Sequence, residues 1–433
     1  MVADQYFRES FKNAGDDILL DLITRCVLPS IKDFMKKRGL TDDDVQTVLN
    51  RRLGTGSSTV QERTLRRNLT LQFFEPLAIR ILSILEQGEG IADPFGESVD
   101  HGMSGRTFRE ILEYGALEKA PHQMKAEVEN FINNDFKELL HDDSFSILDI
   151  PLRVDFVKLQ NLLARCSTFD ICEKAFAYAA EVIAAYNCDI VLLTGRPSRL
   201  PGVLACFRNC TGMAPDRVIA MSSYKISSWY PFAENGHIID PKTTAVVGAM
   251  LCYICSLTTM NNFSFKSGAI RIKSCIRYIG CLDARREHLS DQNIYYRDVD
   301  FDDPKYKLEG DFLLSNTMII GYRQMNIERW PAVPLYELSI SERKAQIISG
   351  KRDAVLSISL ERDGEFAEDY KKAKRGYGYI SPAALKISKV KLQSGDGDED
   401  FSEEDVKLRF CTLQNGTGGF GYWLESGSVI NEE

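Results

Sequence analysis

The chain has 433 residues, of which 44% are hydrophobic and 27% are charged, and its 53 basic and 62 acidic residues give a net charge of −9. A chain of this length can form about two to four domains, and its composition is typical of a globular protein with a real core, which excludes wholesale disorder. The acidic balance argues against broad nucleic-acid binding, because that function needs a positive surface to displace counterions.

The N-terminal residues MVADQYFRESFKNAGDD are charged from the start and carry no secretory signal. The chain holds eleven cysteines without a repeated pairing pattern. Together these features predict reduced thiols and a cytoplasmic protein.

Two long helices are expected in the first part of the chain. In GDDILLDLITRCVLPSIKDFMKKRGL, apolar residues recur at helical spacing, Gly15 and Asp16 stand where an N-cap would, and Lys36 to Gly39 form a stop. The second helix is expected in ERTLRRNLTLQFFEPLAIRILSILEQGEG, bent or broken near Pro76 because proline lacks the N–H that a helix needs. Two shorter helices, in TFREILEYG and APHQMKAEVENFINNDF, follow a loop at residues 88–107.

The middle of the chain alternates between helix and strand. An extended stretch and a helix in ILDIPLRVDFVKLQNLL precede a helix in TFDICEKAFAYAAEVIAAYN, a buried strand in CDIVLLTG, a helix in RLPGVLACFRNCTG, a strand in DRVIAMSSYKI and a helix in DPKTTAVVGAMLCYIC. This alternation is typical of a parallel α/β layer.

The last of these helices lies in a segment without charge, from Thr243 to Phe265. Its apolar part, from about Ala245 to Leu257, is shorter than the ~20 residues that a membrane-spanning helix needs, so a buried core helix is favoured. Cys252 and Cys255 form a CxxC pair on this helix. We favour buried thiols over a zinc or redox site, because no second pair or paired histidines accompany them.

After about residue 260 the pattern changes to short alternating segments punctuated by turns, such as FLLSNTMIIGYRQM and AVLSISLERD, which predict a β-rich module. Residues 394–405, SGDGDEDFSEED, resemble a calcium loop in their spaced aspartates. Counted from Asp396, the first of the spaced aspartates, Phe401 and Lys407 stand at the sixth and twelfth positions, where a calcium loop needs glycine and glutamate, so a solvated acidic loop is favoured.

The stretch NCDIVLLTGRPSRLPGV, at residues 187–203, combines a strand, a glycine, a turn and the first turn of a helix. Such a turn leaves backbone N–H groups open beside Gly195, where the missing Cβ lets a planar ring approach closely. The Arg199 guanidinium can stack on an adenine face, and Pro201 suits the first turn of a helix. The alternative is a tight strand–helix turn with a solvated arginine.

The residues DIVLLTGRPSRLPGV resemble the adenosine-binding motif of the superfamily of actin, sugar kinases and DnaK-type chaperones. Gly195 matches the first glycine of that motif, Arg196 replaces the second, and Arg199 matches the adenine-stacking arginine of the chaperones. Two further stretches resemble the chaperones in the same order along the chain. They are AGDDILLDLI, which resembles a helix start after the second phosphate motif, and IIDPKTTAVVGAM, which resembles the helix that closes the nucleotide domain.

Several residues become candidates through this resemblance. Gly15 and Asp16 match the helix start, Lys242 replaces an acid of the closing helix, and Glu75 and Arg80 lie in the stretch that takes the place of the ribose- and adenine-contacting helix. The implied cofactor-binding set is Gly15, Asp16, Glu75, Arg80, Gly195, Arg196, Arg199 and Lys242, and the implied cofactor is ATP or ADP with magnesium.

A closer resemblance, over nearly the whole chain, is to the virulence factor SrfB family of bacteria, through AGDDILLDLI, LLTGRPSRLPGV and NTMIIGYRQMNIERWPAVPLYEL. The two resemblances imply an α/β fold. A partial actin-like (ribonuclease H-like) ATPase lobe is expected at residues 1–260, with a helical insertion at about 25–145. The β-rich module is expected at residues 261–433.

In the resembled superfamily, phosphate-binding hairpins of the type DxGxxT open each lobe, and none occurs near the beginning of this chain. We therefore expect it to supply the adenosine side of an ATP site without being an ATPase alone, because phosphoryl transfer depends on positioned phosphate ligands and magnesium. The expected partner is a missing N-terminal ATPase half. Two alternatives remain: a noncatalytic scaffold whose β-rich module binds a protein partner, and a different nucleotide- or kinase-type enzyme.

Overall fold

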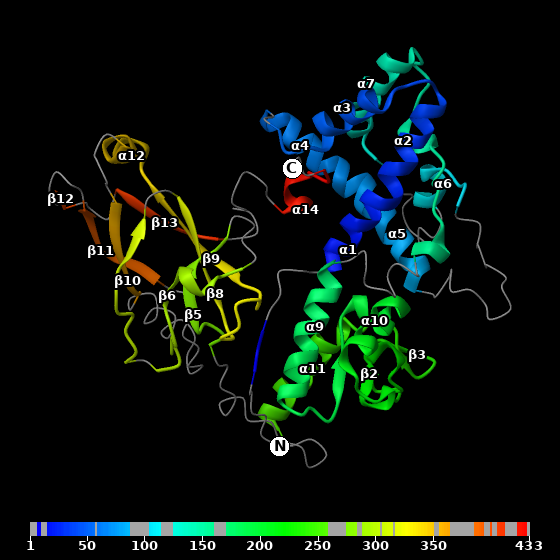
Figure 1. The fold of residues 1–433 in the computed structure, drawn as a ribbon. Helices are drawn as coiled ribbons and strands as arrows, with labels where there is room; N and C mark the ends of the chain where they lie inside the picture. The colour runs from blue at the N-terminus through cyan, green and yellow to red at the C-terminus, as the bar shows by residue number, and fades with distance from the viewer. Residues whose placement is uncertain are drawn as a thin grey trace. The chain divides into compact units, whose positions relative to one another are not determined.

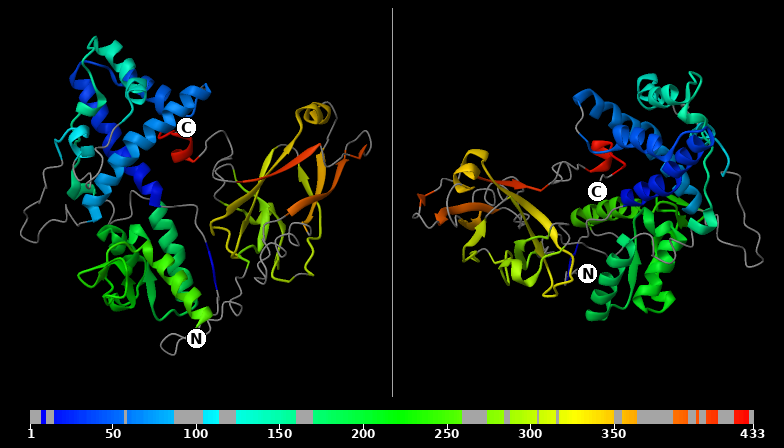
Figure 2. Two further views of the ribbon diagram at one scale, coloured as in Figure 1. Left: turned by 180° about the vertical axis from the view of Figure 1, so that it is seen from behind. Right: turned by 45° about the horizontal axis from the view of Figure 1, so that its top comes forward.

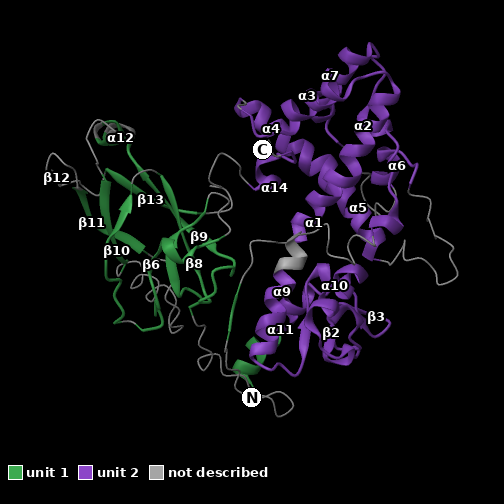
Figure 3. Ribbon diagram, viewed as in Figure 1, with its two compact units in different colours: residues 1–12, 249–412 green, residues 13–248, 413–433 purple. Residues whose placement is uncertain are grey.

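The computed structural model describes residues 7–9, 15–56, 59–86, 104–113, 124–159, 170–258, 274–283, 288–303, 305–314, 317–349, 355–363, 385–393, 399–400, 405–411 and 422–430. The chain divides into two compact units (Figure 3): residues 1–12 with 249–412 form unit 1, and residues 13–248 with 413–433 form unit 2. The described elements are mixed α/β, with several small sheets and a β-rich C-terminal region.

Unit 2 begins with a continuous helical run (Figure 1) made of α1 (Gly15–Leu22), the π turn η1 (Ile23–Val27) and α2 (Leu28–Lys37), which ends before Gly39 at φ +95°. This confirms the predicted helix and its stop. The next helix, α3 (Asp42–Leu53), begins at a capping box in which the Thr41 hydroxyl accepts from the Asp44 N–H and the Asp44 carboxylate accepts from the Thr41 N–H.

A second long helix consists of α4 (Val60–Leu69), the π turn η2 (Thr70–Phe74) and α5 (Glu75–Glu86). The helix was predicted to be bent or broken near Pro76, and a break is wrong: the helix runs through Pro76, because the π turn immediately before it lets the Glu75 N–H bond to the Thr70 carbonyl. A proline removes one i→i−4 bond and crowds the preceding turn, and the wider π turn accommodates both effects. The η1 turn stands in the same position before Pro29, with the Leu28 N–H bonded to the Ile23 carbonyl.

By length and composition, Val60–Glu86 is also a helix that could cross a membrane, found among the described residues. That finding is weak, because core helices of globular proteins meet the same criterion, and Phe73, Phe74, Leu77 and Ile81 of this helix belong to the hydrophobic core of unit 2. Around it pack α6 (Phe108–Glu113), α7 (Ala126–Leu140) and the 3₁₀ turn η3 (Ile147–Asp149).

The α/β part follows the predicted order, and its last helix continues from unit 2 into unit 1 at residue 249. Its elements are α9 (Asp170–Ala185), β1 (Val191–Leu193), η4 (Arg196–Arg199), α10 (Pro201–Thr211), η5 (Pro215–Arg217), β2 (Val218–Ala220), η6 (Met221–Ser223), β3 (Ala233–Glu234), β4 (His237–Ile238) and α11 (Thr243–Leu257). Strands β1 and β2 pair in parallel, with Val191 opposite Val218. Leu200 and Val203 of the strand–turn–helix segment share one core with the long helices, which fixes the turn against them.

Three expectations about this part are wrong. Strand β1 is not buried: Leu192 is 60% exposed, and Ile190 just before the strand is 59% exposed. Among the described residues, β1 pairs only with β2, and one face of this two-stranded sheet stays open. Helix α11 buries Val247 and Cys255 but leaves its opposite face in solvent. The thiols are not all reduced, since Cys206 of α10 is disulfide-bonded, whereas Cys252 and Cys255 are free.

Unit 1 contains two antiparallel sheets that share one core (Figures 1 and 2). One sheet has the order β12 (Glu399–Asp400), β11 (Leu385–Gln393), β10 (Val355–Arg362) and β7 (Phe312–Leu314). The other has the order β13 (Val406–Phe410), β9 (Val333–Ile340), β8 (Met318–Arg323), β5 (Tyr278–Cys281) and β6 (Ile294–Tyr296). Two further short elements are the 3₁₀ turn η8 (Asp291–Asn293) and α12 (Glu342–Ser349).

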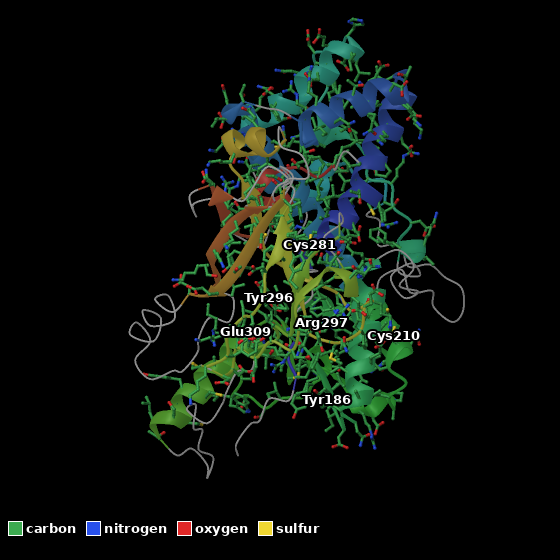
Figure 4. All side chains as sticks on the ribbon, turned by 60° about the vertical axis from the view of Figure 1, so that its left-hand side comes forward. Tyr186, Cys210, Cys281, Tyr296, Arg297 and Glu309 are labelled. Atoms are coloured by element: carbon green, nitrogen blue, oxygen red, sulfur yellow. The ribbon has the colours of Figure 1, made fainter. Side chains whose placement is uncertain are left out.

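Tyrosine hydroxyls tie the two sheets together. The hydroxyl of Tyr296, which Figure 4 labels, lies 3.2 Å from the Leu360 N–H of the other sheet, and that of Tyr336 accepts from the Leu385 N–H at 3.0 Å. Burial raises the pKa of both phenols. These findings agree with the predicted β-rich module, and the aspartates Asp396 and Asp398 of the acidic loop lie outside the described residues.

Residues 422–430 return to unit 2 and carry α14 (Trp423–Ser426). Trp423 and Val429 enter the core of the long helices, the Thr70 hydroxyl donates to the Gly427 carbonyl at 2.8 Å, and the Ile430 N–H donates to the Leu53 carbonyl at 3.2 Å. We call residues 422–430 the C-terminal strap, because they tie α3 to α4 and η2.

Candidate functional site

The turn that follows β1 is built around Gly195, which has φ +82° and ψ 159°. A residue with a Cβ is strained in this region of backbone space, so the turn needs a glycine. The Ser198 hydroxyl and its N–H both donate to the Gly195 carbonyl, at 2.7 and 3.1 Å, and close the 3₁₀ turn η4. Pro201 then starts α10 at its first position, as predicted.

Both arginines of the turn face one buried carboxylate. The Arg196 Nε donates to Glu86 Oε1 at 2.7 Å, and the Arg199 guanidinium lies 3.5 Å from Glu86 Oε2. The Glu86 side chain is 3% exposed, whereas those of Arg196 and Arg199 are 41% and 29% exposed. Arg196 therefore neutralises Glu86 at the C-terminus of α5, and Arg199 is held by the longer and weaker contact.

The N-terminus of α1 lies against the same turn. A Cβ added to Gly15 would lie 3.5 Å from the Pro197 Cγ, an ordinary packing distance. The next residue, Asp16, accepts a hydrogen bond from the hydroxyl of Tyr422 in the C-terminal strap. Burial raises the pKa of that hydroxyl, and the Asp16 hydrogen bond raises it further.

Glu75, at the first position of α5, is in electrostatic range of Asp16. Partial burial raises the pKa of Glu75, and the negative charge of Asp16 adds to the rise. Both effects favour the protonated form of Glu75. Asp16, Glu75 and Tyr422 therefore form an acidic group near the start of α1.

The start of α11 is tied to the end of β1. The Thr194 hydroxyl donates to the Pro241 carbonyl at 2.9 Å and lies 2.6 Å from the Thr244 hydroxyl, which donates to the same carbonyl at 2.7 Å. Lys242 is exposed, and its N–H donates to Asp240 Oδ1 at 2.9 Å. The IIDPKTTAVVGAM segment therefore stands directly beside the residue that precedes Gly195.

The structure brings together most of the candidate residues. Three stretches far apart in sequence meet at the Gly195 turn: residues 15–16, 194–199 and 240–244. Within the described part of the chain, Arg80 makes no side-chain hydrogen bond or ion pair to the other candidates, although its carbonyl accepts from the Ser83 hydroxyl. Lys242 contributes its backbone here, and its side chain is solvent-exposed.

Sequence patterns did not identify Glu86, Thr194, Thr244 or Tyr422 as part of this region. A cue was available for Glu86, a lone acid at the end of an apolar helix. None was available for Tyr422, which meets Asp16 from the opposite end of the chain. Among the described residues, no group of three or more His, Cys, Asp or Glu side chains could hold a metal ion. A magnesium ion here would depend on phosphate oxygens and on ligands from elsewhere.

One protein-family model, described as virulence factor SrfB, matches residues 1–430. No curated protein and no solved structure matches the chain.

Proposed function

The chain belongs to the SrfB family of virulence factors, and on this premise we propose that it supplies the adenosine side of an adenine-nucleotide site. The ligand is ATP or ADP with magnesium. Another polypeptide, or another part of a longer one, contributes the phosphate-binding half. The chain does not hydrolyse ATP by itself.

One observation carries this proposal, the meeting of residues 15–16, 194–199 and 240–244 at one glycine turn. These are the stretches that resemble the nucleotide-binding superfamily, and they lie far apart in the sequence. Gly195 carries no Cβ, so a planar ring can approach the backbone closely at this turn.

The residues take different roles in this site. Gly195 leaves room for the base, and Arg199 stacks on it after releasing its 3.5 Å contact with Glu86. Arg196 keeps Glu86 neutralised through its 2.7 Å hydrogen bond while Arg199 moves. The start of α1 at Gly15 offers open N–H groups toward the ribose.

Phosphoryl transfer needs ligands that hold the phosphates and magnesium in line with a nucleophile. Among the described residues, the Asp16 carboxylate is engaged by the Tyr422 hydroxyl, and no group of three or more His, Cys, Asp or Glu side chains could hold a metal ion. The phosphate half therefore comes from outside this chain in the proposal. Adenosine recognition and catalysis are then separable functions.

A ligand series tests the proposal. Adenosine, ADP and ATP are titrated by calorimetry, each with and without Mg²⁺. A site that recognises only adenosine binds all three with dissociation constants within about threefold, which is below 1 kcal/mol, and Mg²⁺ changes nothing. A gain of about 100-fold from adenosine to Mg·ATP would mean that a phosphate site is present, and the half-site proposal would be wrong.

A second candidate function is a noncatalytic scaffold that binds protein partners. The observation that favours it is the engagement of both turn arginines by Glu86, which gives them a structural role without any ligand. This candidate predicts no heat with any of the nucleotides at millimolar concentration.

A further inference from the structure

Residues 7–9 dock in unit 1 against residues that lie far away in the sequence. Residues 1–12 belong to unit 1 (Figure 3), and the chain passes through residues 13–248 of unit 2 before it returns to unit 1. Residues 7–9 form neither helix nor strand. They are held by side-chain and backbone contacts of the kind that hold a bound peptide.

The centre of this docking is Trp330, whose side chain is 1% exposed. The Phe7 ring meets the Trp330 ring edge to face, with the ring centroids 6.3 Å apart and the ring planes at 87°. Aromatic pairs in this geometry gain stabilisation beyond the apolar area that they bury. The position of Phe7 therefore favours an aromatic side chain.

The Glu9 carboxylate is contacted by two donors. Its Oε2 accepts from the Trp330 Nε1–H at 2.9 Å. With the Gln324 amide assigned so that its nitrogen faces these acceptors, that nitrogen donates to Glu9 Oε2 at 3.0 Å and to the Arg8 carbonyl at 2.5 Å. Hydrogen bonds to a carboxylate are stronger than those between neutral groups, so this position favours an acid.

Both donors come from one connection in unit 1. Gln324 directly follows β8, and Trp330 lies shortly before β9, with its N–H bonded to the Ile327 carbonyl at 2.9 Å. We call the side chains of Gln324 and Trp330 the β8–β9 docking site. The Arg8 guanidinium lies 3.9 Å from Cys275 Sγ, a weak acceptor, so the middle side chain adds little specificity.

The pattern that the site selects follows from these contacts. Phe7 and Glu9 both contact Trp330, as alternate residues of an extended segment can, because they point the same way. The features selected are thus an aromatic side chain and, two positions later, a glutamate.

We propose that the β8–β9 docking site recognises a peptide segment with this pattern and that residues 7–9 occupy it in this chain. A protein partner that presents the same pattern binds here by displacing residues 7–9. The contact is only three residues long, well below the roughly 800 Å² per partner of a standard interface, so a free peptide binds with micromolar affinity. The proposal is independent of nucleotide binding.

The test uses the full chain carrying Phe7→Ala/Glu9→Ala, which weakens its own segment, and a fluorescein-labelled peptide of residues 3–12. Fluorescence anisotropy is expected to show binding with a dissociation constant of about 1–100 µM. The wild-type chain should bind the labelled peptide at least about tenfold more weakly, because its tethered segment competes at an effective concentration of about 1 mM.

A peptide series tests the specificity without changing the protein. Peptides carrying Phe7→Ala or Glu9→Ala should bind the Phe7→Ala/Glu9→Ala chain at least about tenfold more weakly than the parent peptide, because each lacks one anchor. The Arg8→Ala peptide is the matched control and should stay within about threefold of the parent peptide, because the Arg8 side chain makes a weak contact.

On the protein side, Gln324→Ala is added to the Phe7→Ala/Glu9→Ala chain. It should weaken binding of the parent peptide at least about fivefold, because the Glu9 carboxylate loses a donor. Asn326→Ala, which removes an exposed amide of the same connection, is the control and should change nothing. Circular dichroism checks that each variant is folded.

Four results would each overturn the proposal. They are no binding of the parent peptide up to about 1 mM, equal binding of the parent and Glu9→Ala peptides, equal binding by the wild-type and Phe7→Ala/Glu9→Ala chains, and a folded Gln324→Ala variant that binds like its parent chain.

Discussion

Gly195 is the residue on which the turn after β1 depends, since φ +82° with ψ 159° is a conformation that is open to glycine and costly for other residues. We expect Gly195→Ala to lower the free energy of unfolding by about 1–3 kcal/mol, because the added Cβ strains this backbone. Urea unfolding measures the change.

The control is Gly248→Ala in α11, where the added carbon meets nothing within 4 Å. Alanine is favoured over glycine inside a helix by up to about 1 kcal/mol, so this variant should be as stable as the wild type or more so. If the two substitutions change the free energy of unfolding equally, the backbone of the Gly195 turn does not require a glycine.

Asp135 of α7 illustrates a residue whose charge stabilises the fold. Burial by itself would raise its pKa, but hydrogen bonds from Arg52 and Arg51 outweigh burial and hold the pKa below its ordinary value. Because the folded pKa is depressed, the stabilisation is present above the unfolded pKa of about 3.9 and is lost as the pH falls through the folded pKa.

We therefore expect Asp135→Asn to lower stability by about 2–3 kcal/mol at pH 7, since one partner of a mostly buried ion pair is removed. The difference from the wild type should shrink as the pH falls below about 4. Denaturant midpoints across pH 3–7 measure it, and a difference that does not change with pH would mean that the carboxylate charge contributes nothing.

For single residues, the sequence predicted backbone conformation well but did not predict which side chains would be in contact. Gly195 and Pro201 were predicted because backbone demands leave a local signature. Glu86 and Tyr422 were not predicted as neighbours of the turn, because their partners lie far away along the chain and no local pattern encodes them.

At the scale of elements, helices were predicted well because their periodicity and their stops are local. The π turns before Pro29 and Pro76 were missed, and with them the continuity of the second helix. The burial of β1 and α11 was predicted wrongly for a common reason. Apolar runs indicate that something covers an element, but they do not indicate whether the cover belongs to the same chain.

The C-terminal strap provides a test at this scale through Gly427, which has φ +74°. A Cβ there would lie 2.5 Å from the Arg67 backbone nitrogen, so α4 or the strap must move. We expect Gly427→Ala to cost more than about 2 kcal/mol and to speed hydrogen exchange in α4 and the strap.

Gly310→Ala is the control for backbone strain alone, because Gly310 has φ +116° but a Cβ would meet nothing within 4 Å. Gly310→Ala should lower the free energy of unfolding by less than Gly427→Ala does. If Gly427→Ala unfolds no more easily than Gly310→Ala, the strap does not pack closely on α4.

At the scale of the whole molecule, the described residues form separate hydrophobic cores, one in the helical part of unit 2 and a main one between the sheets of unit 1. Leu49 and Leu356 are fully buried in the first and the second of these cores. Replacing a buried leucine by alanine costs about 2–5 kcal/mol.

We expect calorimetry to resolve two unfolding transitions, because units with their own cores unfold as separate cooperative bodies. Leu49→Ala should lower the midpoint of one transition and Leu356→Ala that of the other. A single transition that both variants lower equally would show that the units unfold together.

The family match spans both units, so the helical part, the glycine turn and the β-rich region belong to one family architecture. The sequence alone predicted the order of helix, strand and β-rich parts. It did not predict that residues 422–430 pack in unit 2, because a long-range return of the chain leaves no periodic signal.

The most direct test of the central claim is a calorimetric titration of ATP into the wild type, Arg199→Ala and Arg208→Ala. Arg208 is an exposed arginine of α10 and controls for the loss of one positive charge. The account predicts binding to the wild type and to Arg208→Ala, and at least tenfold weaker binding to Arg199→Ala, a loss of about 1.4 kcal/mol or more. Equal binding to all three, or no binding to the wild type at millimolar ATP, would contradict an adenosine site at the Gly195 turn.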